Sequence, residues 1–209
     1  SPHLYGGTYN LFTNTLKGMG IEVRFADPGE PETFRALSDD KTRAYFGETL
    51  PNPKLVPFPI EEVARIGREL GIPLIVDNTA APITCRPFDF GATIVVHSLT
   101  KYIGGHGTSI GGVIIDSGTF DWVANPNQQP HFNKPDSSYH GAIWGELVPE
   151  ALGAPIAYAV RARVVLLRDL GSALSPTNAF NIIQGLETLA LRFNQHQKNA
   201  SEDVEFLSS

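Results

Sequence analysis

Cysteine and clustered basic residues are scarce in this chain, and long apolar runs are absent. A single cysteine, Cys85, excludes an intrachain disulfide framework and favours a reducing compartment, so we expect a cytoplasmic protein. A net charge of -6 without a Lys/Arg cluster argues against a nucleic-acid partner. No apolar run approaches the roughly 20 residues that cross a bilayer, and no signal peptide is evident, so we expect no membrane partner.

What the chain contains is typical of one globular domain with a buried core. Hydrophobic residues make up 42% and charged residues 18% of the 209 residues. The six histidines show no metal-ligand spacing, and no cysteine pair exists to complete one, so no metal site is expected.

The first half alternates helical spacing with short apolar or β-branched runs, which predicts an α/β fold. Ile60 to Leu70 has a helical apolar spacing, and Gly71 is expected to end that helix. Strands that alternate with helices imply right-handed crossovers, hence a mostly parallel sheet with helices on both faces. The expected strands are Ile21–Phe25, Thr42–Phe46, Leu74–Val76, Thr93–Val96 and Gly112–Ile115.

The second half differs from the first in composition and has fewer strand-like runs. The stretch from Phe120 to Trp144 is polar and rich in proline, which predicts a loop or an insertion, with a lid as one interpretation. Helices are expected over Ala154–Leu170 and Asn178–Phe193, the second opened by a cap-like signal at Ser175. Its helical pattern runs on to Leu207 without a cap.

The sequence patterns at both ends predict that the chain is a piece of a longer protein. We expect residues 1–175 to be the larger part of one domain and residues 176–209 to lead into a second domain.

Chemistry-bearing residues follow two of the expected strands. Asp77 comes after Leu74–Val76, and Ser98, Thr100 and Lys101 come after Thr93–Val96. In open α/β sheets the carboxyl ends of the strands form one ligand-binding edge, so the two groups are expected to face one pocket. An amine, a carboxylate and two hydroxyls suit a phosphorylated pyridine aldehyde: the amine condenses with the aldehyde, the carboxylate pairs with the ring nitrogen, and the hydroxyls bind phosphate.

Each of these residues also has an ordinary structural explanation. An Asp after a strand is often a turn residue, a Ser-x-Thr pair often shapes a turn, and a lone Lys is nearly always a surface charge. Periodicity alone does not name the cofactor.

A more specific signal is the sequence around these residues, which resembles the signature of the Cys/Met-metabolism family of fold-type-I pyridoxal-phosphate enzymes. The resemblance extends over essentially the whole chain. Its strongest segments are Val76-Asp77-Asn78-Thr79 and Val95-Val96-His97-Ser98-Leu99-Thr100-Lys101-Tyr102-Ile103-Gly104-Gly105-His106-Gly107.

The resemblance implies roles for individual residues. Lys101 is expected to hold pyridoxal 5'-phosphate as a Schiff base, with Asp77 on the ring nitrogen and Ser98 and Thr100 on the phosphate. Tyr5, in Tyr5-Gly6-Gly7-Thr8, matches the tyrosine that stacks on the cofactor ring and assists proton transfer or leaving-group departure.

Asn52 matches an asparagine near the phenolic oxygen of the cofactor. Without the resemblance, Tyr5 is explained as a turn residue and Asn52 as a loop residue between two prolines.

Within the family, the segment from Tyr5 to Phe12 resembles the version found in O-acetylhomoserine sulfhydrylases, as does the long segment from Tyr139 to Leu189. The implied reaction is γ-replacement of acetate in O-acetyl-L-homoserine by sulfide, which gives L-homocysteine in methionine biosynthesis. The alternative is a cystathionine γ-synthase, γ-lyase or methionine γ-lyase type of reaction on the same scaffold.

The family also implies a homo-oligomer, a dimer of dimers whose active sites are shared between subunits. The tyrosine and arginine that a neighbouring subunit supplies to the phosphate are expected upstream of Ser1. The arginine that binds the substrate carboxylate is expected beyond Ser209. Arg192 does not match that arginine.

Two motifs are typical of other classes of protein, but each lacks a feature that its class requires. The segment from Gly107 to Gly111 matches the Gly-x-Ser-x-Gly turn of serine hydrolases, but a strand rather than a helix is expected to follow it. The glycines of 104–112 match neither nucleotide-phosphate motif, and close backbone packing is the better explanation. His97 and His106 are expected to be packed and hydrogen-bonded, and His131 and His140 to be solvated.

Overall fold

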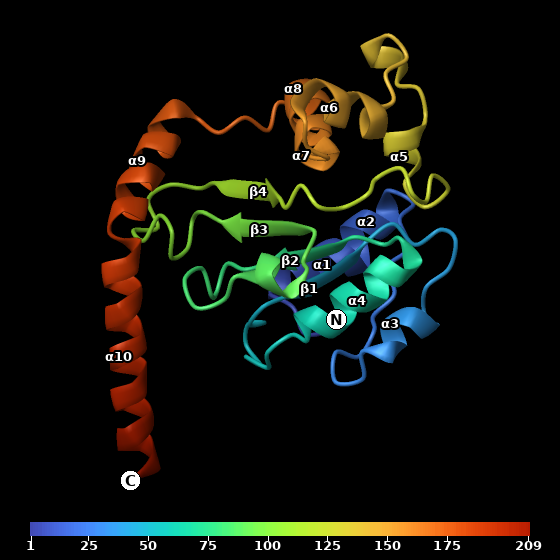
Figure 1. Cartoon of the computed structure of the whole chain (residues 1–209). Helices are drawn as coiled ribbons and strands as arrows, with labels where there is room; N and C mark the ends of the chain where they lie inside the picture. The colour runs from blue at the N-terminus through green and yellow to red at the C-terminus, as the bar shows by residue number, and fades with distance from the viewer.

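A computed structural model, which describes residues 1–209, has a four-stranded sheet at its centre (Figure 1). The strands are β1 (Tyr45–Glu48), β2 (Leu74–Asp77), β3 (Ile94–Ser98) and β4 (Gly112–Asp116), in the spatial order β1-β2-β3-β4. β1, β2 and β3 are parallel, and β4 runs antiparallel to β3. The predicted α/β class with a mostly parallel sheet is therefore confirmed.

Helices and turns of helix fill the connections. Three consecutive helical segments form one continuous helix over residues 6–18, and three more form a second continuous helix over residues 157–170. None of the helices is long and apolar enough to cross a membrane. The elements are α1 (Gly6–Asn10), η1 (Leu11–Thr15), α2 (Leu16–Gly18), α3 (Glu32–Ala36), α4 (Ile60–Leu70), η2 (Pro87–Phe90), α5 (Pro130–Asn133), η3 (Ser137–Tyr139), α6 (Trp144–Leu152), α7 (Ala157–Arg161), η4 (Ala162–Leu167), α8 (Arg168–Leu170), α9 (Pro176–Glu187) and α10 (Leu189–Ser208).

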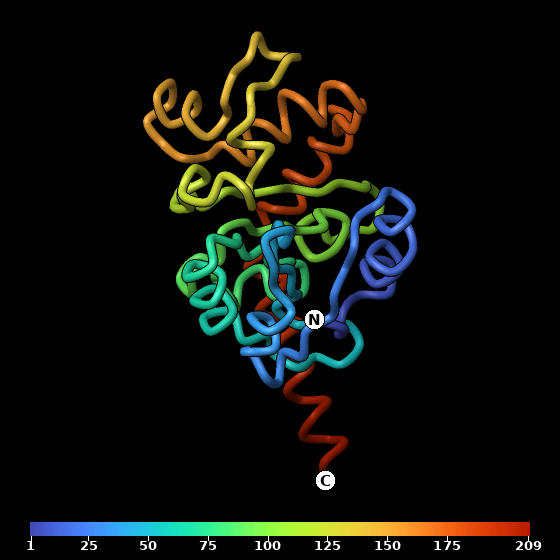
Figure 2. Tube along the Cα trace, turned by 90° about the vertical axis from the view of Figure 1, so that its right-hand side faces the viewer, coloured from blue at the N-terminus to red at the C-terminus, as the bar shows by residue number.

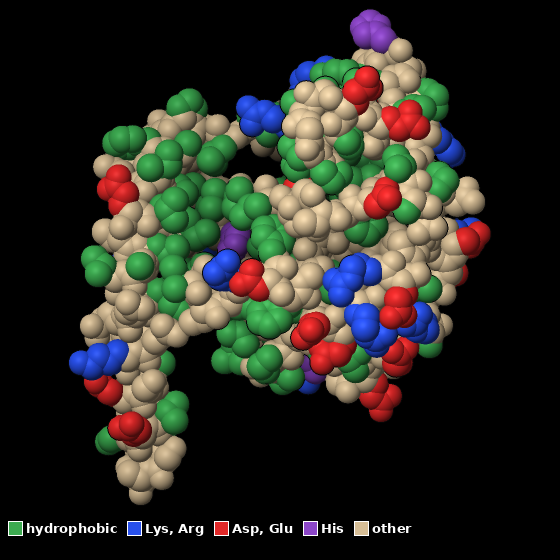
Figure 3. Space-filling view, in the orientation of Figure 1, with side chains coloured by type: hydrophobic (Ala, Val, Ile, Leu, Met, Phe, Trp, Pro, Cys, Tyr) green, Lys and Arg blue, Asp and Glu red, His purple; other side chains and the backbone are tan.

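Helix α4 has the predicted bounds, and its sequence explains why. Ile60, Val63 and Ile66 recur at helical spacing and are buried against the sheet. Gly71 ends the helix with φ +69°, a left-handed conformation that glycine adopts without a Cβ clash. On the outer faces of α3 and α4, Arg and Glu side chains form exposed ion pairs, visible as interspersed blue and red in Figure 3.

Both faces of the sheet are covered. In β2, Leu74 and Val76 belong to a core cluster that also contains α4, while Ile75 packs against a second cluster around Trp122 and Trp144. Because side chains alternate along a strand, this split places the two clusters on opposite faces. Figure 2 shows the chain between about residues 120 and 170 as a layer of its own, away from the N-terminal third.

Some predicted elements are wrong. Residues 21–25 form no strand, since no neighbouring strand hydrogen-bonds to them. β1 begins at Tyr45 rather than Thr42, because Thr42 belongs to a turn with Asp39. β3 is shifted by one to two residues and ends at Ser98.

The region from Phe120 to Trp144 is mostly loop and turn, as its composition predicted, but it also contributes to the core. It contains α5 and η3, and Trp122 and Phe132 are buried in the second core cluster. Burial of these aromatic side chains holds the region against the body, although the residues between them are polar. The helix predicted from Ala154 begins at Ala157, and the one predicted over Asn178–Phe193 is divided at Thr188.

Helices α9 and α10 stand beyond the carboxyl end of β3 (Figure 1). The hydroxyl of Ser175 caps α9 by accepting a hydrogen bond from the backbone N–H of Asn178, at 3.1 Å, as predicted. Hydrophobic side chains gather over α9 and the surface beside it (Figure 3). The end of α10 extends away from the body (Figure 2).

Candidate active site

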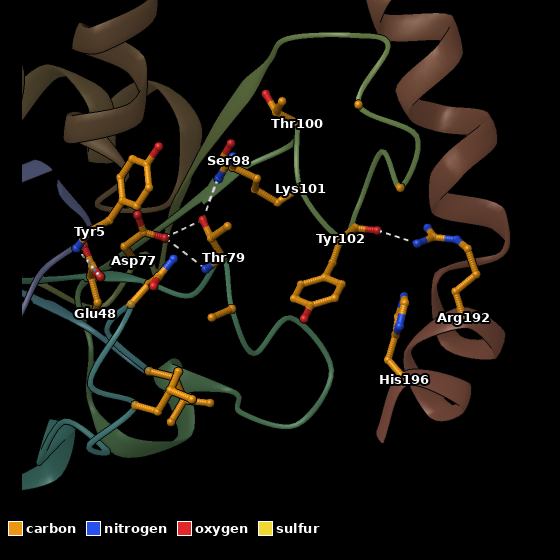
Figure 4. Close-up of a pocket in the computed structure, with 16 residues that line it drawn as sticks. Tyr5, Glu48, Asp77, Thr79, Ser98, Thr100, Lys101, Tyr102, Arg192 and His196 are labelled. Atoms are coloured by element: carbon orange, nitrogen blue, oxygen red, sulfur yellow. Dashed lines mark hydrogen bonds between the residues drawn. The ribbon is translucent and has the colours of Figure 1, made fainter. Parts of the chain in front are cut away.

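A pocket of about 730 Å³ opens at the carboxyl ends of β1, β2 and β3. This volume lies within the range of small-molecule sites. Figure 4 shows Tyr5, Asp77, Thr79, Ser98 and Lys101 together on one side of it, with Tyr102, Arg192 and His196 on the other. All six residues predicted from the sequence line it: Tyr5, Asn52, Asp77, Ser98, Thr100 and Lys101.

Asp77 is the last residue of β2, and a local turn fixes its carboxylate. Oδ1 accepts hydrogen bonds from the backbone N–H of Thr79 at 2.9 Å and from the Thr79 hydroxyl at 2.5 Å. The same hydroxyl oxygen accepts from the backbone N–H of Ser98 at 2.7 Å, which ties the end of β2 to the end of β3. Oδ2 has no protein partner, so one carboxylate oxygen is free for a ligand.

Lys101 lies on the glycine-rich loop between β3 and β4. Its side chain is exposed, and Nζ lies 5.8 Å from the centre of the Tyr5 ring, within reach of a cation–π contact. None of the ion pairs in the structure includes this ammonium. The amine is therefore available to react.

The two hydroxyls beside Lys101 differ in how much of their bonding capacity is used. The Thr100 hydroxyl makes long contacts with the backbone of Gly111, accepting from its N–H at 3.2 Å and facing its carbonyl at 3.4 Å. The Ser98 hydroxyl has no partner within the protein. Ser98 can therefore donate to an anion at once, whereas Thr100 exchanges a weak contact to do so.

Tyr5 is held by a residue that the sequence did not single out. Its backbone N–H donates to both carboxylate oxygens of Glu48, each at 2.9 Å, across 43 positions of sequence. Glu48 is 6% exposed, and burial raises its pKa, with the charge of Asp77 acting in the same direction. The Tyr5 ring is half-exposed at the pocket. Asn52 lines the pocket from the loop after β1.

Close backbone contacts explain the glycines after Lys101, as predicted. A Cβ on Gly104 would lie 2.6 Å from the carbonyl oxygen of Leu99. A Cβ on Gly185 of α9 would lie 2.1 Å from the carbonyl oxygen of Gly104. α9 thus packs directly on the lysine loop because neither glycine carries a side chain.

The hydrolase motif is set aside on structural grounds as well. Ser109 is buried, and β4 begins three residues later, so its hydroxyl is not displayed between a strand and a helix.

Arg192 and His196, one turn apart on α10, form the far wall of the pocket together with Tyr102. The Arg192 guanidinium donates to the carbonyls of Tyr102 at 2.8 Å and Gly185 at 2.7 Å. It also donates to the Ile103 carbonyl at 3.2 Å and the Thr188 hydroxyl at 3.1 Å. The only sequence signal for this wall is the spacing of four residues on one helix face.

The histidines are only partly as predicted. His97 is half-buried, but its Nδ1 has no hydrogen-bond partner, and burial lowers its pKa. His106 is exposed rather than packed, since the loop that carries it faces solvent. His131 and His140 are exposed as predicted. The structure contains no group of three or more metal-ligating side chains.

Comparison with known proteins gives consistent results. Residues 1–209 match the family described as Cys/Met metabolism PLP-dependent enzyme. The chain is 50% identical to the O-acetyl-L-homoserine sulfhydrylase of Leptospira meyeri over 99% of this chain and 47% of that protein. It is 45% identical to the homocysteine/cysteine synthase of Saccharomyces cerevisiae over 98% of this chain and 46% of that protein.

Among solved structures, a Campylobacter jejuni protein assigned as an O-acetylhomoserine (thiol)-lyase superposes with a TM-score of 0.91 at 39% identity. The match covers 99% of this chain and 50% of that one, whose structure contains a pyridoxyl-lysine phosphate. The chain therefore spans about half the length of the relatives that it matches.

Proposed function

Because the chain belongs to the Cys/Met metabolism family of PLP-dependent enzymes, we propose that it carries the cofactor-binding part of an O-acetylhomoserine sulfhydrylase. The reaction is γ-replacement of acetate in O-acetyl-L-homoserine by sulfide, which gives L-homocysteine. The observation that supports this proposal best is the pocket that Lys101, Asp77 and Tyr5 line together at the carboxyl edge of the sheet. Relatives at 45% and 50% identity carry the names of this activity.

The residues of the pocket fit pyridoxal 5'-phosphate. Lys101 offers an amine without an ion-pair partner for the aldehyde, and Asp77 offers a free oxygen, Oδ2, for the ring nitrogen. Ser98 offers a hydroxyl without a partner for the phosphate, and Thr100 offers a second one. When bound, the cofactor supplies a protonated ring that withdraws electrons from the substrate carbon.

Two residues complete the proposed cofactor site. The Tyr5 ring lies at the pocket close to Lys101 Nζ and is placed to stack on a planar ligand. Asn52 lines the pocket and would donate from its amide to the phenolic oxygen of the cofactor.

The proton transfers are assigned to Lys101 and Tyr5. The Lys101 amine removes the proton from the α-carbon of the substrate and moves it during the replacement. The hydroxyl of Tyr5, whose ring centre lies 5.8 Å from that amine, assists the departure of acetate from the γ-carbon. Sulfide then bonds to the γ-carbon, so that a carbon–oxygen bond is exchanged for a carbon–sulfur bond without a change of oxidation state.

The wider organisation is proposed on the family resemblance. We propose residues 1–175 as part of the cofactor-binding domain and residues 176–209 as the start of a second domain. A homo-oligomer, a dimer of dimers with sites shared between subunits, and a cytoplasmic location belong to the same proposal.

The experiment is to express the complete coding sequence, add pyridoxal phosphate and record the visible spectrum before and after borohydride reduction. A visible band that borohydride abolishes, with the cofactor mass found on the peptide that contains Lys101, is expected. Homocysteine from O-acetylhomoserine and sulfide should exceed α-ketobutyrate, since replacement rather than elimination is proposed. Colourless protein would contradict the cofactor, and α-ketobutyrate as the main product would favour the lyase alternative.

A further inference from the structure

Glu48 is a buried carboxylate at the edge of the pocket that no step proposed above uses. It is the last residue of β1 and pairs in register with Asp77, the last residue of β2. Side chains at paired positions of parallel strands point to the same face, so two acidic side chains lie next to each other there. Burying a carboxylate beside a second one costs free energy unless other groups compensate.

The hydrogen bond to Tyr5 is one of the compensating contacts, and the Thr8 side chain and the Asn52 backbone also stabilise the Glu48 carboxylate. Both oxygens of Glu48 accept from the Tyr5 backbone N–H at 2.9 Å. Tyr5 precedes α1 as its N-cap residue, and its own side chain makes no capping hydrogen bond. The Tyr5 carbonyl accepts from the Tyr9 N–H at 2.9 Å within the helix, so the Glu48 carboxylate is the contact that ties the Tyr5 backbone to the sheet.

We infer that Glu48 is a positioning residue that sets the place of the Tyr5 ring over the pocket through the Tyr5 backbone. The inference rests on the proposed function, in which Tyr5 stacks on the cofactor and assists the leaving group. A ring that shifts by about 1 Å loses its alignment with the reacting atoms, and such misplacement costs about a hundredfold in rate.

The first test is a double-mutant cycle in the holoenzyme. Glu48→Met keeps the length of the side chain and removes the acceptor oxygens, and should lower kcat/KM about tenfold to a hundredfold. In a Tyr5→Ala background the same substitution should lower it less than threefold, because no ring remains to be positioned. Glu48→Gln keeps an amide oxygen and should recover most of the loss. Glu62→Met, an exposed acid on α4, is the matched control and should leave activity unchanged.

The second test needs no activity. In cofactor-free protein, hydrogen exchange at the Tyr5 amide should be slow in the wild type and in Glu48→Gln, and at least tenfold faster in Glu48→Met. If Glu48→Met does not fold, Glu48→Asp replaces it, since one methylene less withdraws the carboxylate from the amide.

Three results would overturn the inference: additive losses in the cycle, a Gln variant as impaired as the Met variant, or unchanged exchange at the Tyr5 amide. A wild-type protein that binds no pyridoxal phosphate would overturn the proposed function instead. In that case the exchange experiment still decides whether Glu48 holds Tyr5.

Discussion

The two walls of the pocket are built from similar kinds of residue but differ in what those residues can still bind. On the sheet side, Lys101, Ser98 and one oxygen of Asp77 have no protein partner. On the helix side, the Arg192 guanidinium is already bonded to three carbonyls and a hydroxyl. A charged side chain at a pocket is thus available for a ligand only if its hydrogen bonds are not already made, and this condition separates Lys101 and Asp77 from Arg192.

The largest expected effect is the loss of the amine on the sheet side. Lys101→Ala should lower kcat by at least about 10²–10⁴-fold, because the group proposed to bind the cofactor and transfer the proton is gone. The measurement is steady-state homocysteine formation together with the visible spectrum. Because Lys101 is exposed, the thermal midpoint of the cofactor-free protein should not change. A Lys101→Ala variant with near-normal turnover would contradict the proposed role.

The next effect concerns the carboxylate. Asp77→Asn keeps an oxygen that accepts from Thr79 but removes the charge, so the fold should persist while kcat falls about 10²–10³-fold. Circular dichroism and turnover measured on the same preparation separate the two quantities. Thr79→Val is the informative companion, since it removes the hydroxyl that joins β2 to β3 and leaves the Asp77 charge in place.

On the helix side, a structural rather than a chemical effect is expected. Arg192→Met removes hydrogen bonds from a charged group to backbone carbonyls, and should lower the free energy of unfolding by about 1–3 kcal/mol. Urea denaturation measures the change, and Arg192→Lys should recover part of it. A raised KM for the substrate with unchanged stability would instead assign Arg192 to substrate binding.

The smallest effect concerns pH and the half-buried His97 behind the sheet edge. Burial lowers its pKa below the ordinary 6.5, so the unfolded chain binds the proton more readily than the folded chain. Stability is therefore retained above about pH 6.5 and is lost as the pH falls from there through the lower folded-state value. His97→Gln should make the thermal midpoint depend less on pH between about pH 7 and 5. An unchanged slope would mean that other groups cause the acid sensitivity.

Local patterns predicted the parts of the fold that depend on local physics. The spacing from Ile60 to Leu70 and the glycine after it define α4, and the apolar run from Leu74 defines β2. Residues 21–25 have the composition of a strand but lack a neighbouring strand to pair with, and a single segment carries no information on that. The antiparallel direction of β4 likewise depends on how the chain returns after the lysine loop.

The residues of the site likewise divide into those that the sequence predicted and those that it did not. The strand-end rule brought Asp77 and Lys101 to one edge, and the family resemblance added Tyr5. Glu48 was missed because its contact with Tyr5 spans 43 positions and involves a backbone N–H, which no side-chain motif encodes. The role of Arg192 was missed because the carbonyls of Tyr102 and Ile103 come within its reach only when α10 packs on the loop, about 90 positions away in sequence.

The loop that carries Lys101 has one further consequence, which concerns tolerance to change. Ser98 pairs with Gly112, and the Leu99 N–H donates to the Gly111 carbonyl at 2.9 Å, so the loop leaves and re-enters the sheet at neighbouring points. Its exposed tip at Gly107 and Thr108 lies beyond these ties. Extra residues or a reporter group inserted after Thr108 should lengthen the excursion without altering the strand register, whereas an insertion before Gly107 would disturb the lining of the pocket.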